Sequence, residues 1–398
     1  MAAVPPLIIV ADDLTGAMDA AAPLAERGLS TWVVVEPECY ARQTLPAAQV
    51  VSINAGSRHL PKEDATQRVR ALSSEWVGPG CEILIKKIDS TLRGNAVAET
   101  LALLEASGRA AAVVAPAFPR QGRTLVAGVV HVHGVPLANT ELAHDTLSPP
   151  PIEALHVLFR AAAPQAEVRL VARGASLAVS RGGRRQIFVV DAASDEDLRS
   201  TVRALSSRLS DTVLVGSAGI AEAVAQTCFE PAREALAVPA VREQLVFVVG
   251  SRTEQSAQQV RALIESGRAR LIAAPAGCVD LSAALRAPEA LLVIKAEPDS
   301  GGTQTDAAEV ARRLADAAGT LIERQPIAAL VATGGDTAFA VLRRLGQATV
   351  QVMGNLLPGI PFSRIRCGAR ELWLVTKAGG FGSRDTLATI AQRLRGDV

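Results

Sequence analysis

The segment LIIVADDLTG (residues 7–16) determines the fold class, because an apolar run is followed at once by two acids and then by a helical pattern. All five residues of Leu7–Ala11 are apolar, as expected of a strand that is buried on both faces of a parallel sheet. Residues 16–28 then carry small and apolar side chains at helical spacing. A strand that passes into a helix through Asp12 and Asp13 predicts an α/β unit with ligands at the carboxyl ends of its strands.

The same alternation continues along the chain and divides it in two. Further strands are expected at residues 31–35, 50–53, 83–87, 111–115, 187–191 and 213–216, with helices at 61–76, 95–107 and 194–209. Residues 116–185 predict loops and short elements over the sheet, and residues 229–243 predict a link. The alternation then restarts with strands at 245–249, 291–294, 328–332, 350–353 and 372–376, and helices at 253–266, 306–323, 337–345 and 385–394.

We therefore predict two α/β domains, residues 1–235 and 236–398, each a mostly parallel sheet flanked by helices. The active site is expected in the interdomain cleft, where small ligands commonly bind.

Composition and charge exclude several classes of protein. The 41 Lys and Arg residues nearly balance the 40 Asp and Glu residues, which argues against a nucleic-acid partner that would need a basic face. No apolar run approaches the roughly 20 residues that span a bilayer, and the first residues lack a basic leader. Five dispersed cysteines without a CxxC pair favour neither zinc nor disulfides. We expect a cytoplasmic protein without a membrane partner; a homo-oligomer is compatible with the sequence, which does not define the oligomeric state.

Charged residues follow the strands of the first half. They are Asp12 and Asp13 after the first strand, Lys87, Asp89 and Arg93 after another, and Arg120 and Arg123 after a third. Cations can hold the carboxylate of a polyhydroxy acid while the acids accept hydrogen bonds from its hydroxyls, which predicts a site for a small sugar acid. Two structural alternatives remain open: Asp12 and Asp13 cap the following helix, or Lys87 and Asp89 form an ion pair.

Glycine-rich loops follow the strands of the second half. They contain Ser251, then Gly334, Gly335 and Asp336, then Gly354, Asn355, Leu356, Leu357, Pro358 and Gly359, and finally Gly379 and Gly380. Glycine lets backbone N–H groups approach an anion, and a helix N-terminus favours negative charge, so these loops suit nucleotide phosphates. Tight turns are the structural alternative for each glycine pair. A Walker A sequence and a GxGxxG after the first strand are both absent. His131, His133 and His144 lack zinc-like spacing to a further ligand, so we predict no metal there.

At these residues the sequence resembles the four-carbon acid sugar kinase family over nearly its whole length. The similar segments are VADDLTGAMD (10–19), KKIDSTLRGN (86–95), PAFPRQGRT (116–124), HVHGVPLANTELAHD (131–145), VVGSRTEQSAQQ (248–259), ATGGDTA (332–338), LPGIP (357–361) and TKAGGFG (376–382). The resemblance implies an N-terminal sugar-acid-binding domain, a C-terminal nucleotide-binding domain and ATP-dependent phosphorylation of threonate, erythronate or a 3-oxo-tetronate.

The resemblance also implies roles for individual residues. Nucleotide contacts fall on Ser251, residues 354–359 and Gly379, and substrate contacts fall on Asp13, Lys87, Asp89 and Arg93. Arg252, Gly380 and the segment Asp145-Thr146-Leu147 depart from the family pattern near the nucleotide and the substrate.

We hypothesise that Asp13, or else Asp89, deprotonates the attacking hydroxyl. The amides of Gly334, Gly335, Gly379 and Gly380 would hold the γ-phosphate, and Asp336 would lie beside Mg²⁺. Two other classes were weighed. A haloacid-type phosphatase needs DxDx[TV], whereas Asp12 and Asp13 are adjacent. A non-catalytic sugar-acid sensor would not need four anion-binding loops.

Overall fold

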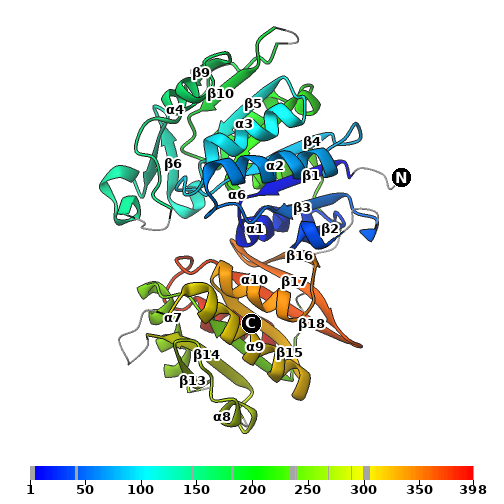
Figure 1. The fold of residues 1–398 in the computed structure, drawn as a ribbon, viewed down its shortest axis with the longest axis vertical. Coiled ribbons are helices and arrows are strands. Elements are labelled where there is room, and N and C mark those ends of the chain that lie inside the picture. The colour runs from blue at the N-terminus through cyan, green and yellow to red at the C-terminus, as the bar shows by residue number, and fades with distance from the viewer. Residues whose placement is uncertain are drawn as a thin grey trace. The chain divides into compact units, whose positions relative to one another are not determined.

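The protein consists of two compact units, Met1–Arg233 and Glu234–Val398 (Figure 1). The computed structural model describes residues 5–40, 44–144, 148–180, 183–233, 238, 240–267, 269–287, 289–298 and 305–397. The division falls after residue 233, whereas the sequence analysis places the boundary after residue 235. The departure noted at Asp145-Thr146-Leu147 lies outside the described residues, as does part of the expected link.

Unit 1 contains a sheet in which all eight strands are parallel. Its order is β2-β3-β1-β4-β11-β5-β10-β9, formed by β1 (Leu7–Ala11), β2 (Thr31–Val34), β3 (Val50–Asn54), β4 (Ile83–Lys87), β5 (Ala111–Ala115), β9 (Glu167–Val171), β10 (Gln186–Val190) and β11 (Thr212–Gly216). Strands β1, β3, β4, β5, β10 and β11 are buried at every residue, which explains why the sequence shows them as unbroken apolar runs.

Helices cover both faces of this sheet. One face packs against α2 (Lys62–Trp76), α3 (Ala96–Ala106) and α4 (Leu155–Ala162), and the other against α1 (Leu14–Ala25), α5 (Asp195–Ala204) and α6 (Ala218–Cys228). Figure 1 shows α2 and α3 side by side across the first of these faces. Alternate residues of each strand enter the two cores, so Ile8 and Val10 face one layer and Leu7 and Ile9 face the other.

The expectation of only loops and short elements over residues 116–185 is partly wrong. The segment does hold a small antiparallel sheet of β6 (Arg123–Val126), β7 (Val129–Val132) and β8 (Val135–Pro136), but it also holds α4 and β9. Strand β9 joins the main sheet beside β10. It is an edge strand in which Glu167 and Arg169 interrupt the apolar residues and only Val171 is buried, so it lacks the apolar run of the inner strands.

Unit 2 has a mixed sheet with the order β13-β14-β12-β15-β18-β17-β16. Its strands are β12 (Gln244–Val249), β13 (Arg270–Pro275), β14 (Leu291–Glu297), β15 (Ile327–Thr333), β16 (Thr349–Leu357), β17 (Ile360–Cys367) and β18 (Arg370–Lys377). Strand β17 is antiparallel to both neighbours, and the others that pair are parallel. Helices α7 (Glu254–Glu265) and α11 (Thr386–Arg395) share one core with the sheet, α9 (Ala307–Arg324) packs against α10 (Gly335–Arg344), and α8 (Leu281–Leu285) is short.

The predicted fold class, two α/β units with mostly parallel sheets flanked by helices, is confirmed. The predicted bounds of β1, β4 and β5 coincide with those observed. The strands β13 and β17 and the helix α6 were not predicted. Strand β17 mixes polar with apolar residues, α6 is rich in alanine, and the short apolar run of β13 contains two alanines and ends in proline, which are poor strand formers.

A buried ion pair ties β4 to the helix that follows it. Lys86 and Glu99 are 0% and 1% exposed, and the Lys86 Nζ lies 2.8 Å from a Glu99 oxygen. The same amine donates to the carbonyl oxygens of Lys87 at 3.0 Å and Val10 at 3.3 Å. Such a pair fixes α3 against the centre of the sheet, and neither charge can be removed alone without leaving the other unpaired.

We therefore expect Lys86→Met to lower the free energy of unfolding by about 3–5 kcal/mol, because the buried Glu99 carboxylate loses its partner. The double variant Lys86→Met/Glu99→Leu should recover most of that loss. Arg70→Met is the control, since Arg70 pairs with Glu105 on the exposed surface and should cost less than about 1 kcal/mol. Urea unfolding followed by circular dichroism measures all three; equal losses in Lys86→Met and Arg70→Met would contradict the role of the buried pair.

Candidate functional site

The centre of the unit 1 sheet is a point at which the connections change face. Strand β1 leads into α1 on one face, whereas its neighbours β3 and β4 lead into α2 and α3 on the other. In open α/β sheets, a ligand crevice forms where adjacent strands diverge in this way. The carboxyl end of β1 carries Asp12 and Asp13, so this topology places both acids at such a position.

Asp13 serves as the N-cap of α1. Its Oδ1 accepts a hydrogen bond from the Gly16 amide at 2.8 Å, which confirms the capping alternative for this residue. Its Oδ2 lies outside the cap, and the side chain is 22% exposed. Asp13 therefore both begins the helix and presents a carboxylate oxygen beyond it.

Arg58 links the acids at the ends of β1 and β4, and we call Asp12, Asp13, Arg58 and Asp89 the acid cluster. Its guanidinium donates to both oxygens of Asp12 at 2.8 and 3.0 Å and to Asp13 Oδ2 at 2.6 Å, and it lies 3.9 Å from Asp89. The backbone of the loop after β3 is held in place as well, because the amides of Ser57 and Arg58 donate to the Asp12 carbonyl. The sequence analysis missed Arg58. It follows a predicted strand within five residues, so the same strand-end criterion could have found it.

Asp12 and Asp89 are held ionised by the arginines beside them. Burial alone would raise the pKa of Asp12 and of Asp89, but neighbouring guanidinium groups outweigh it. Arg58 lowers the pKa of Asp12, and Arg93 together with Arg58 holds the pKa of Asp89 well below its usual range. Both carboxylates are therefore anions at neutral pH with their oxygens already engaged.

The loop after β4 folds around Asp89. Arg93 donates to its two oxygens at 3.0 and 2.8 Å, and the Thr91 hydroxyl and amide also donate to it. Lys87 is not joined to Asp89 among the described ion pairs; its amine donates to the Ile88 carbonyl at 2.9 Å. That amine lies 3.0 Å from where a Cβ on Gly16 would stand, so the glycine leaves room for it beside α1.

The two arginines after β5 have different surroundings. Arg123 lies close enough to Asp89 and Arg93 for their charges to act on it, and its buried Nε has no hydrogen-bond partner among the described residues. Arg120 instead pairs with Asp195 at 2.9 Å and approaches Glu222 to 3.5 Å. The structure therefore brings Arg123 to the acid cluster, whereas Arg120 is held by a second group of acids.

Two further acids near the cluster have raised pKa values. Burial raises the pKa of Asp19 to about 7, with Lys87 opposing the shift and Glu222 and Asp13 adding to it. Burial likewise raises the pKa of Glu222 to about 7, against the charge of Arg120. Sequence reasoning did not single out either residue, because each lies within a helix and its burial depends on the packing of α1 against α6.

The protonation of Asp19 makes the stability of the protein depend on pH. The unfolded side chain loses its proton near pH 3.8 and the folded one near 7, so over this window the folded state binds more protons and stability falls as pH rises. On going from pH 5 to pH 8, we expect the free energy of unfolding of the wild type to fall by about 2–3 kcal/mol relative to that of Asp19→Asn, which cannot titrate at this position. Urea unfolding at both pH values tests this, with Asp64→Asn on the exposed side of α2 as control. The same stability difference at both values would contradict it.

Unit 2 has a corresponding crevice, lined by glycine. Strand β12 leads into α7 and its neighbour β15 into α10, and these helices belong to different layers. Ser251 follows β12, Gly334 with a φ of 106° begins α10, and Gly379 follows β18. A Cβ on Gly379 would stand 2.2 Å from the Ser251 hydroxyl oxygen, and one on Gly334 would stand 3.5 Å from the Ser251 amide. The three segments meet closely, and only glycine permits the contact at residue 379.

Hydrogen bonds fix the loop after β18. The hydroxyls of Thr253 and Ser256 donate to the Gly379 carbonyl at 3.2 and 2.9 Å. The Lys377 amine donates to the carbonyls of Ala378, Gly379 and Phe381 at 2.8–3.2 Å, and burial lowers its pKa to about 8. The Phe381 amide donates to the Ala378 carbonyl at 3.1 Å, so the amides of Gly379 and Gly380 are the ones that this loop can offer to an anion.

The prediction that residues 354–359 form a loop is wrong in part. Gly354, Asn355, Leu356 and Leu357 belong to β16, and only Pro358 and Gly359 form the turn into β17. The expected strand 350–353 ended too early because Gly354 and Asn355 are poor strand formers; here they lie at register irregularities opposite Phe362 and Pro361. Since β17 runs back antiparallel to β18, the turn lies at the same edge of the sheet as the carboxyl end of β18.

Carboxylates suited to a metal are sparse. Asp336 is exposed in the first turn of α10, beside Gly334 and Gly335. Within the described parts of the chain, three or more His, Cys, Asp or Glu residues do not gather into a group that could hold a metal ion. His131 lies on β7, with its Nδ1 3.1 Å from the Val129 carbonyl, and His133 lies after that strand.

The two units of the chain match two known protein families. Residues 7–224 match a family described as a sugar-binding N-terminal domain, and residues 246–387 match one described as a nucleotide-binding C-terminal domain. The chain is 34% identical over 404 residues to a D-threonate kinase of Bordetella bronchiseptica, covering 97% of each chain, and 32% identical over 421 residues to a D-threonate kinase of Salmonella typhimurium, covering 96% of each.

The chain belongs to the four-carbon acid sugar kinase family. The family and the kinase class that the eight motifs predict are therefore confirmed. A D-erythronate kinase of Heliobacterium modesticaldum is more distant within this family, at 26% identity over 434 residues, covering 98% of this chain and 97% of the relative.

Solved structures share the fold of this kinase family member. A Salmonella typhimurium LT2 protein described as a tRNA synthase superposes with a TM-score of 0.77 at 24% identity, covering 97% of this chain and 98% of that one. A Haemophilus influenzae protein gives a TM-score of 0.69 at 21% identity, covering 98% and 100%. Among the described residues, none of the helices is long and apolar enough to cross a membrane.

A single methyl group added at Gly379 should disturb the glycine-lined crevice of unit 2. We expect Gly379→Ala to weaken ATP binding by more than about tenfold, because its Cβ would displace the Ser251 hydroxyl and with it the loop. Gly380→Ala is the matched control, since a Cβ there meets no atom within 4 Å. Titration with a fluorescent ATP analogue measures both; equal affinities in the two variants would show that this close approach does not shape the nucleotide site.

Proposed function

We propose that the protein transfers the γ-phosphoryl group of ATP to a hydroxyl of a four-carbon sugar acid, with D-threonate as the first candidate. D-Threonate is favoured because the relatives at 32–34% identity that match nearly the whole chain are named D-threonate kinases. The D-erythronate kinase is 26% identical and the 3-oxo-tetronate kinases are 28–30% identical.

The observation that carries this proposal is the cluster of Asp12, Asp13, Arg58 and Asp89 at the crevice of unit 1. A polyhydroxy acid needs acceptors for its hydroxyl hydrogens and cations for its carboxylate, both rigidly placed. The buried Nε of Arg123 is a donor without a partner among the described residues, which suits an anionic ligand. We assign the substrate carboxylate to Arg123 and Arg93, and the hydroxyls to the aspartates and Lys87.

Asp13 is the candidate general base. Asp12 and Asp89 accept paired bonds from Arg58 and Arg93, and their lowered pKa values make them poor proton acceptors. Asp13 has one oxygen committed to the helix cap and the other 2.6 Å from Arg58, and its side chain is more exposed than those of Asp12 and Asp89. We infer that this second oxygen orients the attacking hydroxyl and takes its proton.

The nucleotide phosphates fit the crevice of unit 2. The N-terminus of α10 at Gly334 and Gly335 and the loop at Gly379 and Gly380 offer backbone N–H groups, and Ser251 lies between them. Mg²⁺, when bound with ATP, supplies charge neutralisation on the phosphate oxygens, and Asp336 is the carboxylate positioned to hold it. The turn at Pro358 and Gly359 lies along the same sheet edge and is assigned to the nucleotide with residues 354–357.

Substituting Asp13 should separate the chemical step from ATP binding. We expect Asp13→Asn to reduce kcat by about 10²–10⁴-fold, because the amide keeps the shape of the side chain but cannot take the proton. ATP affinity should stay at the wild-type value. Asp64→Asn, at an exposed position of α2, is the control and should retain full activity. Steady-state kinetics with D-threonate measures this, and near-normal turnover in Asp13→Asn would remove the residue from the chemical step.

ADP release with Mg²⁺ and ATP against a panel of D-threonate, L-threonate, D-erythronate and 3-oxo-tetronate tests the proposed function. The highest kcat/KM should belong to D-threonate. Comparable rates with every acid would argue against selectivity for it, and absence of ADP release by folded, ATP-binding protein would overturn the activity. A sensor would bind the acid without producing ADP.

A further inference from the structure

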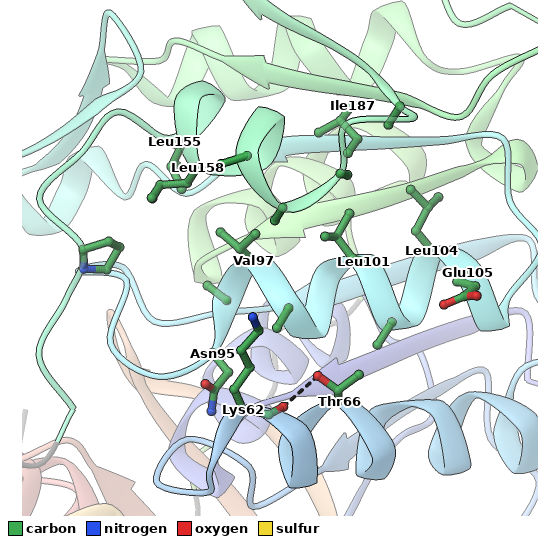
Figure 2. Close-up of a pocket in the computed structure, with 18 of the residues that line it drawn as sticks. Lys62, Thr66, Asn95, Val97, Leu101, Leu104, Glu105, Leu155, Leu158 and Ile187 are labelled. Atoms are coloured by element: carbon green, nitrogen blue, oxygen red, sulfur yellow. Dashed lines mark hydrogen bonds between the residues drawn. The ribbon is translucent and has the colours of Figure 1, made fainter.

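A cavity of about 1050 Å³ lies in unit 1 between α2, α3 and α4, on the face of the sheet that these helices cover. Figure 2 shows it extending along α3, with side chains of α2 on one side and of α4 and β10 on the other. Its volume is at the upper end of the range in which proteins bind small molecules, about 300–1,000 Å³. Its lining residues do not include Asp12, Asp13 or Arg58, so it is distinct from the acid cluster.

The wall of the cavity is mostly aliphatic. Val97, Leu101 and Leu104 project from α3, Leu155 and Leu158 from α4, and Ile187 from β10, as Figure 2 shows. Three of these side chains, those of Val97, Leu101 and Leu158, are only partly buried by the protein itself. An apolar ligand would cover the remainder and gain about 25 cal/mol for each Å² removed from water.

The charged residues that line the cavity indicate the sign of the charge that a ligand would carry. They are Lys62, Arg70 and Arg185 against a single acid, Glu105. Arg70 pairs with Glu105 at 2.7 Å, and Arg185 is close enough to act on the same carboxylate, which leaves an excess of positive charge. The Lys62 amine makes no hydrogen bond or ion pair that the structure records among the described residues, and Figure 2 shows it beside Asn95 at the start of α3.

We propose that this cavity binds a small amphipathic anion, an apolar chain or ring that ends in a carboxylate. The apolar part lies along α3 against Leu101 and Leu158, and the carboxylate lies at the Lys62 end. Lys62 supplies the charge that Arg70 cannot, because the Arg70 guanidinium is already engaged by Glu105.

The occupant also reaches the loop that follows β4. Leu92, Gly94 and Asn95 line the cavity and belong to the same loop as Asp89 and Arg93. Leu92 has a φ of 63°, a conformation that a non-glycine residue holds only when its surroundings impose it, and its amide donates to the Asp89 carbonyl at 3.0 Å. A ligand that packs on Leu92 therefore contacts the segment that positions Asp89.

Calorimetric titration of the full chain with sodium octanoate tests the proposal without reference to kinase activity. We expect saturable binding at one site, weakened at least about tenfold by Leu158→Glu and several-fold by Lys62→Met. Val157→Glu is the matched control, because Val157 is the preceding residue of α4, is 48% exposed and does not line the cavity. Octan-1-ol, which lacks the charge, should bind the wild type and Lys62→Met equally.

A measurement on the wild type covers the case in which Leu158→Glu fails to fold. Octanoate should slow amide hydrogen exchange in peptides that contain residues 92–101 and 155–158, and leave unit 2 unchanged. Absence of saturable binding to the folded wild type, or equal binding by Leu158→Glu and Val157→Glu, would overturn the proposal. So would protection that appears only with rising protein concentration, which would mean that a second copy of the chain covers this face.

Discussion

The sugar-acid site depends on the Arg58 guanidinium, which pairs with both Asp12 and Asp13 and lies 3.9 Å from Asp89. Three carboxylates at the ends of two neighbouring strands would repel one another, and burial opposes the ionisation of Asp12 and Asp89. The Arg58 guanidinium, whose own charge is opposed by burial but stabilised by these acids, keeps Asp12 ionised, acts with Arg93 on Asp89, and holds Asp12 and Asp13 in fixed positions. Because Arg58 comes from the loop after β3, the bond also holds together the three strand ends around which the connections diverge. The site is therefore rigid before any ligand arrives.

The two units share one topological feature, but the residues placed there differ in their chemistry. In each, adjacent parallel strands lead into helices on opposite faces and open a crevice at their carboxyl ends. Unit 1 fills its crevice with paired charges, which suit hydroxyls and a carboxylate. Unit 2 surrounds its crevice with Gly334 and Gly379 and occupies the nearby carbonyls with Lys377, Thr253 and Ser256, which leaves N–H groups for phosphates. These two kinds of crevice fit a family whose two domains are described as sugar-binding and nucleotide-binding.

The sequence predicted most where burial is most uniform. Strands such as β1, β4 and β5 are buried on both faces, so their apolar runs define their bounds. Antiparallel β17 has polar residues among its apolar ones, and β16 contains glycine and asparagine at register irregularities, so neither shows an unbroken run. Edge strand β13 has a short apolar run, but it contains two alanines and ends in proline, which are poor strand formers. Asp12, Asp13, Asp89 and Ser251 were found because they follow strands directly. Arg58 was missed although it lies only four residues after the end of β3, nearer to its strand than Arg93 lies to β4, so the strand-end criterion would have included it. The ion pairs of Arg120 with helices α5 and α6 depend on packing that no local pattern records.

If the Arg58 cluster binds the sugar acid and the glycine crevice binds the nucleotide, substitutions in the two places should affect different ligands. Calorimetric titration with D-threonate in the absence of ATP distinguishes them, with Arg58→Lys and Gly379→Ala compared with the wild type. Lysine keeps the charge of Arg58 but cannot bond to two carboxylates at once in the same geometry, so we expect D-threonate to bind at least about tenfold more weakly to Arg58→Lys and with unchanged affinity to Gly379→Ala. Wild-type affinity in Arg58→Lys, together with a loss in Gly379→Ala, would contradict it.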